Sequence, residues 1–197
     1  MEYFASAIKK GAAGPVLLEK ALIKKSNIPL LLAITCHEDT QDLKDFILEA
    51  GAWFQNHAAT KLRKKVISFE RGSEEAFESL LGEEQIAAMR EKSEKGEISF
   101  AFCVGAGALI SGSCAWLLQS SFGKVSAALM FPSEEDTVIL SEGASIVLTG
   151  SGTSITEDRD KLECIFNAKD EQTLERSVRE ATEELADISM ISIKAEA

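Results

Sequence analysis

The sequence predicts an α+β protein in which helices cover antiparallel sheets. Apolar segments of strand length, separated by turns, occur in groups at the start and in the second half of the chain. The long helical patterns are gathered between these groups and near the end, and such runs of strands and helices indicate antiparallel sheets rather than βαβ units. The chain has 197 residues, 45% of them hydrophobic. We therefore expect one domain, residues 1–197, with a substantial core.

The first part of the chain predicts three strands and a long helix. The strands are YFASAIKKG, LLEKALIKKS and IPLLLAITC, divided by turns that include Gly11 and Gly14. Asp39 or Thr40 is the expected N-cap of the helix that follows. Apolar residues at helical spacing then carry this helix to residues 61–65.

The rest of the chain predicts helices at both ends of a series of strands. A second helical stretch begins at Ser73 and is interrupted by Gly82. The charge-free segment Ile98–Gly123 then predicts two or three buried strands, with a tight turn at Ser111–Ser113 joining two of them. The elements expected after it are strands in KVSAALMFP, DTVILSEG and ASIVLTGSG, a short helix capped by Asp158 or Asp160, a helix in DEQTLERSVREATEEL and a closing strand in ISMISIKAE.

Charge and composition disfavour several classes of function. The formal net charge is −11, whereas a sequence-independent nucleic-acid binder and a protein that docks on anionic membranes both need cationic surface. Residues 98–123 are long enough to span a bilayer, but their turn residues favour buried strands. The four cysteines form no C-x-x-C pair, and the N-terminus lacks a signal-peptide pattern. We expect a cytoplasmic protein with reduced thiols and no nucleic-acid or membrane partner.

The segment SEGASIVLTGSGTSI, residues 141–155, places a small turn, Gly150-Ser151-Gly152, directly after an apolar strand. Such a turn is a common position for a functional group, and here it presents Ser151. A nucleophilic serine needs a nearby base, and the chain has two histidines, His37 and His57. The turn lacks the G-x-S-x-G pattern of a nucleophile elbow, so a Ser151–His37 pair is disfavoured.

In the order of its elements and in its turn motifs, the chain resembles the metal-dependent protein phosphatases of the 2C type, which include the bacterial sporulation stage II E phosphatases. The family's late motif is Gly-Asp, an apolar strand and Ser-Asp-Gly. EGASIVLTGSG has this spacing, with Ala144 and Ser151 at the two Asp positions. The family's Asp-Asn before a last strand that opens with Ile-Ser or Ile-Thr corresponds to Ala186 and Asp187.

Three earlier motifs extend the resemblance to roughly Tyr3–Lys194. The family's Gly-Asp-Ser corresponds to Gly112-Ser113-Cys114, its Asn-Glu-Asp-Ala corresponds to LEKA with Glu19 and Lys20, and its Asp-Gly-Met-Gly-Gly turn corresponds to TCHED, Thr35–Asp39. The resemblance implies a four-layer α/β/β/α sandwich of two antiparallel sheets flanked by helices.

The resemblance also implies a metal site, because carboxylates at strand ends of this family hold two Mn²⁺ or Mg²⁺ ions whose bridging water attacks a phosphoserine or phosphothreonine. Hard divalent ions need oxygen ligands, chiefly carboxylates, and most of these are replaced here. We therefore expect no catalytic residue, no metal and no other cofactor. The vestigial metal-site positions are Glu19, Lys20, Thr35, Cys36, Ser151 and Asp187, and the possible cleft residues are His37, Glu38, Asp39, Ser113 and Gly152.

The sequence thus favours a catalytically inactive phosphatase-like protein, a pseudophosphatase, that acts as a binding or regulatory module on another protein. Its oligomeric state stays open. One alternative is an active Mn²⁺- or Mg²⁺-dependent serine/threonine protein phosphatase with a divergent site. It requires that several of the following carboxylates converge: Glu19, Glu38, Asp39, Asp158, Asp160 and Asp187. Another alternative is an unrelated α+β assembly module, which a different strand order would reveal.

Overall fold

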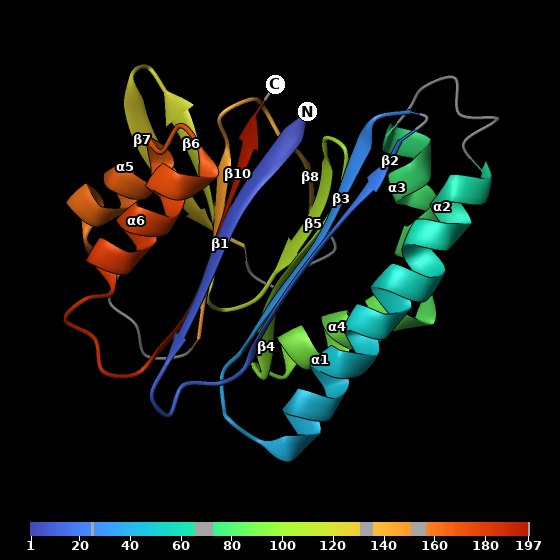
Figure 1. Cartoon of the computed structure of the whole chain (residues 1–197), viewed down its shortest axis with the longest axis horizontal. Coiled ribbons are helices and arrows are strands. Elements are labelled where there is room, and N and C mark those ends of the chain that lie inside the picture. The colour runs from blue at the N-terminus through green and yellow to red at the C-terminus, as the bar shows by residue number, and fades with distance from the viewer. Residues whose placement is uncertain (25, 66–72, 131–135, 151–156, 197) are drawn as a thin grey trace.

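The computed structural model describes residues 1–24, 26–65, 73–130, 136–150 and 157–196. Within these ranges ten strands form two five-stranded sheets that pack face to face, and helices cover both outer faces (Figure 1). Every pair of neighbouring strands is antiparallel. The prediction of a four-layer α/β/β/α sandwich of two antiparallel sheets is therefore confirmed.

Sheet A has the strand order β1-β10-β9-β6-β7, and sheet B has the order β2-β3-β4-β5-β8. The strands of sheet A are β1 (Glu2–Lys10), β6 (Ala115–Ser121), β7 (Lys124–Leu129), β9 (Ser145–Thr149) and β10 (Ile188–Glu196). The strands of sheet B are β2 (Val16–Ile23), β3 (Ile28–Cys36), β4 (Ile98–Val104), β5 (Gly107–Ser111) and β8 (Thr137–Ile139). The two ends of the chain lie at the same end of the sandwich (Figure 1).

The helices fall into two groups, one on each sheet (Figure 1). Sheet B is covered by α1 (Gln41–Trp53), which continues through the π-helical turn η1 (Phe54–Ala58) into α2 (Ala59–Lys65), and by α3 (Ser73–Leu81) and α4 (Glu84–Glu94). Sheet A is covered by α5 (Arg159–Phe166) and α6 (Glu171–Ala181). The Thr40 hydroxyl caps α1, and the Asp158 carboxylate caps α5, as the sequence predicts.

The apolar residues form three clusters that match the layers. One cluster lies between the sheets, one lies under the helices of sheet B and one lies under α5 and α6. Strand β3 contributes to two of them, because Leu30 and Leu32 face the helices whereas Leu31 and Ala33 face sheet A. A strand buried on both faces must be apolar at successive positions, which explains the run IPLLLAI.

The charge-free segment forms three strands rather than a single hairpin. Strands β4 and β5 are paired with each other and are joined by a turn at Gly105 and Ala106. The turn expected at Ser111–Ser113 does join β5 to β6, but it carries the chain from sheet B to sheet A, so these two strands do not pair. Among the described residues there is no helix with the length and apolar character needed to cross a membrane.

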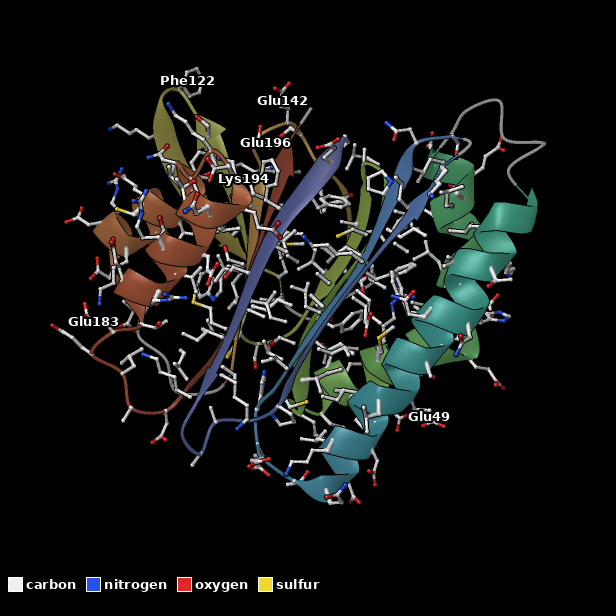
Figure 2. The ribbon with its side chains drawn as sticks, viewed as in Figure 1. Glu49, Phe122, Glu142, Glu183, Lys194 and Glu196 are labelled. Carbon is white, nitrogen blue, oxygen red and sulfur yellow. The ribbon has the colours of Figure 1, made fainter. Side chains whose placement is uncertain are left out.

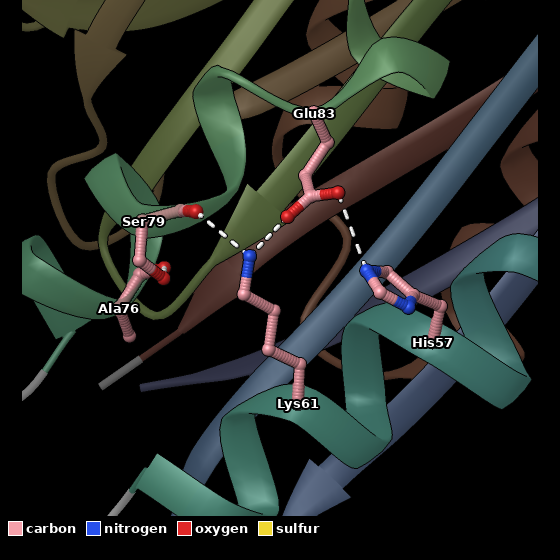
Figure 3. Close-up of polar contacts among 5 residues, drawn as sticks. All are labelled: His57, Lys61, Ala76, Ser79 and Glu83. Atoms are coloured by element: carbon pink, nitrogen blue, oxygen red, sulfur yellow. Dashed lines mark hydrogen bonds and ion pairs between the residues drawn. The ribbon is translucent and has the colours of Figure 1, made fainter.

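Hydrogen bonds between side chains, and from side chains to backbone, connect the helices to one another and to the sheets. On the sheet B side, Glu83 accepts hydrogen bonds from Lys61 and from His57, the latter at 3.2 Å (Figure 3). The hydrogen bond from Lys61 holds the pKa of Glu83 below its ordinary value. On the sheet A side, the ammonium of Lys194 donates to the carbonyl oxygens of Phe166 and Ala168, both at 2.6 Å (Figure 2). A cation there satisfies carbonyls at the C-terminal end of α5.

We expect Phe102→Ala to lower the free energy of unfolding by about 3–5 kcal/mol, because it leaves a cavity under the helices of sheet B. The Phe102 ring is fully buried and contacts the rings of Trp53, Phe54 and Phe77. Urea unfolding measures the change, and Leu48→Ala is the control because Leu48 is 68% exposed. Equal midpoints for the two variants would contradict this account of the core.

Candidate functional site

Several strands end at the same edge of the sandwich, opposite the chain ends (Figure 1). The register explains why the strand ends lie together, because the last residue of one strand is paired with the first residue of its neighbour or lies next to it. The pairs at this edge are Val16 with Thr35, Ile98 with Cys36, Ala115 with Leu148, Thr149 with Met190 and Lys10 with Ile188. We call this region the strand-end site. Three of the six vestigial metal positions named from the sequence, Thr35, Cys36 and Asp187, lie here.

Thr35 links the two sheets at the strand-end site. Its side chain is fully buried near the end of β3. The hydroxyl lies 3.3 Å from the carbonyl oxygen of Thr149, at the end of β9 in sheet A, and 3.4 Å from the carbonyl oxygen of Ser99 in β4. A hydroxyl that donates to backbone carbonyls in this way closes the space between the sheets with a neutral group.

His37 and Ser99 continue this network toward the surface. The His37 Nδ1 atom lies 2.7 Å from the Gly96 carbonyl oxygen, and Nε2 lies 2.9 Å from the Ser99 hydroxyl. A carbonyl only accepts, so in the neutral ring Nδ1 carries the hydrogen and Nε2 accepts from Ser99. The Ser99 oxygen in turn accepts from the Cys114 backbone N–H at 3.3 Å. Burial lowers the pKa of His37, against the opposing effects of the Gly96 carbonyl and Glu38, so the neutral form is favoured.

Ser99 and His37 resemble a nucleophile and its base, but the packing argues against that role. The Ser99 side chain is fully buried. Gly112 lies directly over it, since a Cβ added at Gly112 would lie 2.3 Å from the Ser99 hydroxyl oxygen and 2.7 Å from the Ser99 Cα. A substrate atom therefore has no access to this hydroxyl, and Ser99 is better described as a residue that orients His37 and Cys114.

Backbone groups close the remaining part of the strand-end site. A Cβ at Gly14 would lie 2.2 Å from the Cys36 carbonyl oxygen, so only glycine fits there. The Ser189 hydroxyl donates to the Gly14 carbonyl, and the Gly150 N–H donates to the Ser189 carbonyl at 2.8 Å. Burial, with a smaller effect of the negative charge of Asp39, raises the pKa of the Cys36 thiol to about 12. Cys36 is therefore a neutral thiol at physiological pH.

Asp187 is at the strand-end site, where it stabilises a turn. Its Oδ1 atom accepts a hydrogen bond from the Ala12 N–H at 2.7 Å. A Cβ at Gly11 would lie 1.9 Å from the same oxygen, which shows how closely the turn between β1 and β2 packs on this carboxylate. Ala144, by contrast, precedes β9 and lies at the opposite end of that strand.

The structure places Glu19 and Lys20, two of the predicted vestigial metal positions, away from the strand-end site. Strand β2 begins at Val16, so Lys20 is four residues, about 13 Å, along the strand from this edge. Glu19 accepts a hydrogen bond from the Gln55 side chain at 2.8 Å, and Lys20 forms an ion pair with Glu171 at 2.8 Å. The match of LEKA to the family motif implies that β2 begins near Glu19, whereas β2 begins at Val16.

The expected cleft residues lie in different surroundings. Glu38 lines a cavity of about 370 Å³ between the start of α1 and the end of α4. Asp39 is paired with Lys44 at 3.2 Å. Ser113 is exposed in the turn before β6, whereas Ser151 and Gly152 are outside the described residues.

Carboxylates do not converge at the strand-end site within the described ranges. Of the six candidates from the sequence, Asp187 alone contributes to its network, and Asp158 and Asp160 belong to the start of α5. No group of three or more His, Cys, Asp or Glu side chains in the described part of the chain is placed to hold a metal ion. The groups present are hydroxyls, a neutral thiol, an imidazole, backbone groups and the single carboxylate of Asp187. These do not fit a pair of Mn²⁺ or Mg²⁺ ions, which need several carboxylates.

Sequence analysis missed the residues that make this network, namely Ser99, Thr149, Ser189 and Gly14. Each is a small residue at or beside a strand end, and such residues are ordinary at turns. The feature that could have identified them is their position, because an antiparallel sandwich brings these four separate strand ends to one edge. That signal is readable only after the strand order and register are known.

Comparison of the sequence with models of protein families gives no match, and comparison with the sequences of curated proteins gives none either. Comparison of the fold with solved structures does give matches. The PPM Ser-Thr phosphatase MsPP from Mycobacterium smegmatis, in complex with cacodylate, has a TM-score of 0.55 at 7% identity, over 100% of this chain and 99% of that chain. The catalytic domain of the serine/threonine protein phosphatase PstP, in complex with two manganese ions, has a TM-score of 0.52 at 11% identity, over 100% and 98%.

A third similar structure contains the RsbU and RsbW domains of Rv1364c from Mycobacterium tuberculosis, with a TM-score of 0.51 at 12% identity, over 100% of this chain and 61% of that chain. The chain thus has the fold of the 2C-type, or PPM, metal-dependent protein phosphatases, and the family resemblance read from the sequence is confirmed at the level of fold. The whole chain matches this fold, which disfavours an unrelated α+β fold as the alternative.

We expect the wild-type protein to lose stability relative to a His37→Gln variant as the pH falls from about 8 to about 5. The folded state lowers the pKa of His37, so the unfolded chain binds the proton more readily and acid favours unfolding. The stabilisation that neutral His37 gives the folded state is present above pH 6.5, the pKa of an unperturbed histidine, and it is lost as the pH falls below that value. Urea unfolding at several pH values measures the difference.

The control is His57→Gln, which removes the second histidine and leaves His37 in place. This variant should keep the decline that His37→Gln lacks. Parallel pH profiles for the wild type and His37→Gln would contradict the assignment of a buried, neutral imidazole.

Proposed function

We propose that this chain is a pseudophosphatase: a catalytically inactive protein with the 2C phosphatase fold that acts by binding another protein and regulating it. The observation that carries the proposal is the composition of the strand-end site. Where a two-metal enzyme needs carboxylates, the Thr35 hydroxyl, the Ser99 hydroxyl and the His37 ring hydrogen-bond to one another or to backbone groups.

The packing at this edge supports the same proposal. Gly14 and Gly112 bring backbone so close to Cys36 and Ser99 that a single added carbon would collide with them. The region is thus filled by the protein's own atoms. Its remaining carboxylate, Asp187, is engaged by the Ala12 N–H. A bridging water acquires a lowered pKa only when carboxylates hold two cations beside it, and this network has a single carboxylate.

A protein partner is supported by charge and by analogy. The net charge of −11 disfavours nucleic acid and anionic lipid as ligands. In Rv1364c, a chain with a similar fold also carries a further domain, RsbW. We also propose a cytoplasmic location with no resident metal. The four cysteines are free thiols in the structure, in keeping with a reducing compartment.

The test is hydrolysis of p-nitrophenyl phosphate and of a phosphoserine peptide by the purified protein with Mn²⁺ and, separately, with Mg²⁺. We expect no hydrolysis above the rate in buffer with either ion, because the strand-end site lacks the ligands to hold them. The matched control is Asp187→Asn, which removes the one carboxylate of the network.

Metal-dependent hydrolysis by the wild type that Asp187→Asn abolishes would overturn the proposal and favour the active phosphatase with a divergent site. Hydrolysis that is equal in the two proteins would point to a contaminating enzyme, and a preparation freed of it then has to show no activity.

A further inference from the structure

Strand β7 has one edge that pairs with no other strand among the described residues, which we call its free edge. It is the last strand of sheet A and pairs only with β6 among the described strands. The Met130 N–H donates to the Ala115 carbonyl at 2.8 Å, so position 130 directs its backbone groups toward β6. Backbone groups alternate sides along a strand. The N–H and C=O groups of Val125, Ala127 and Leu129 therefore point away from the sheet.

This edge lacks the features that usually prevent a strand from pairing with another chain. Natural edge strands are protected by several charges, by proline, by a bulge or by a short length. β7 has six residues with no proline, its one charged residue is Lys124 at its first position, and Ala127 and Ala128 at its centre are exposed. β8, the end strand of sheet B, is by comparison only three residues long.

The sequence of β7 is complementary to itself when two copies run antiparallel. With Ala127 opposite Ala127 of the second copy, Val125 faces Leu129 and Lys124 faces Met130. The two apolar pairs would stabilise the contact, and the small central residues allow close approach. The two lysines fall at opposite ends, about 20 Å apart, which is well beyond the screening length of about 8 Å in physiological salt. No like charges oppose each other in this register.

Phe122 is a second, independent observation at the same hairpin. It is fully exposed at the tip between β6 and β7 (Figure 2). Its φ of 51° lies in the left-handed region, as does the 74° of Gly123. A bulky residue in this conformation is strained by about 1–3 kcal/mol, and such strain is found chiefly at functional positions. In the antiparallel register the ring extends past Met130 of the second copy, which is only half-buried.

We propose that the free edge of β7 is a self-association site at which a second copy of this chain adds its own β7 in antiparallel orientation. The two copies are then related by a twofold axis at Ala127, and sheet A of one copy continues into sheet A of the other. The exposed ring of Phe122 gains a contact near Met130 of the second copy. The isologous geometry closes after two copies, so the product is a dimer rather than a fibre. This inference goes beyond the proposed function, since β7 takes no part in the strand-end network.

Sedimentation equilibrium on the full chain tests the proposal through charge reversal at Ala127. Because this residue faces itself, Ala127→Lys alone and Ala127→Glu alone should each give monomers at concentrations where the wild type is a dimer. An equimolar mixture of the two variants should recover the dimer, since lysine then faces glutamate. Ala52→Lys, on the exposed side of α1, is the matched control and should remain dimeric.

A second variant separates association from folding. Phe122→Asn should leave the chain folded, because asparagine tolerates the left-handed conformation better, and it should weaken the dimer in sedimentation equilibrium through loss of the ring. Circular dichroism checks the fold. The proposal is overturned if the wild type is monomeric throughout, if either charged variant stays dimeric, or if their mixture does not re-associate.

Discussion

The close packing of the two sheets is the constraint on which the rest of the structure depends. Small and medium side chains of sheet B, among them Ala33 and Ala101, face Ile146, Leu148 and Ile191 of sheet A in one buried cluster. Because the inner faces interdigitate, the registers of the two sheets are fixed relative to each other. The ends of β3, β4, β9 and β10 must then meet at one edge, whatever residues occupy them.

Under the proposed function, the residues at that edge determine whether the chain can hydrolyse a phosphoester. In this chain most of them are neutral donors and acceptors that satisfy one another: Thr35 bonds across the sheets and His37 bonds to Ser99. The carboxylate of Asp187 is engaged by the Ala12 N–H. Buried neutral networks of this kind favour a rigid structure, whereas a cluster of carboxylates without cations would repel itself. In the described part of the chain, internal hydrogen bonds of this kind occupy the strand-end site.

Much of the fold could be predicted from the sequence, because its elements depend on local signals. The apolar run of β3, the cap at Thr40 and the break at Gly82 are local and were recognised. The position of Lys20 and the crossing of the chain between sheets after Ser111 depend on pairing partners, which sequence alone does not reveal. For the same reason Ser99 was missed, since its contacts with His37 and Gly112 come from other strand ends.

Calorimetric titration of the chelator-treated protein with Mn²⁺ at neutral pH tests the central claim most directly, with the PstP catalytic domain as the positive control. The account predicts no binding heat at millimolar metal, because the hydrogen-bonded network of the strand-end site contains one carboxylate, Asp187, which is already engaged by the Ala12 N–H. Saturable binding of two ions per chain, reduced by Asp187→Asn, would contradict it. That result would mean that the strand-end site opens to form a metal centre.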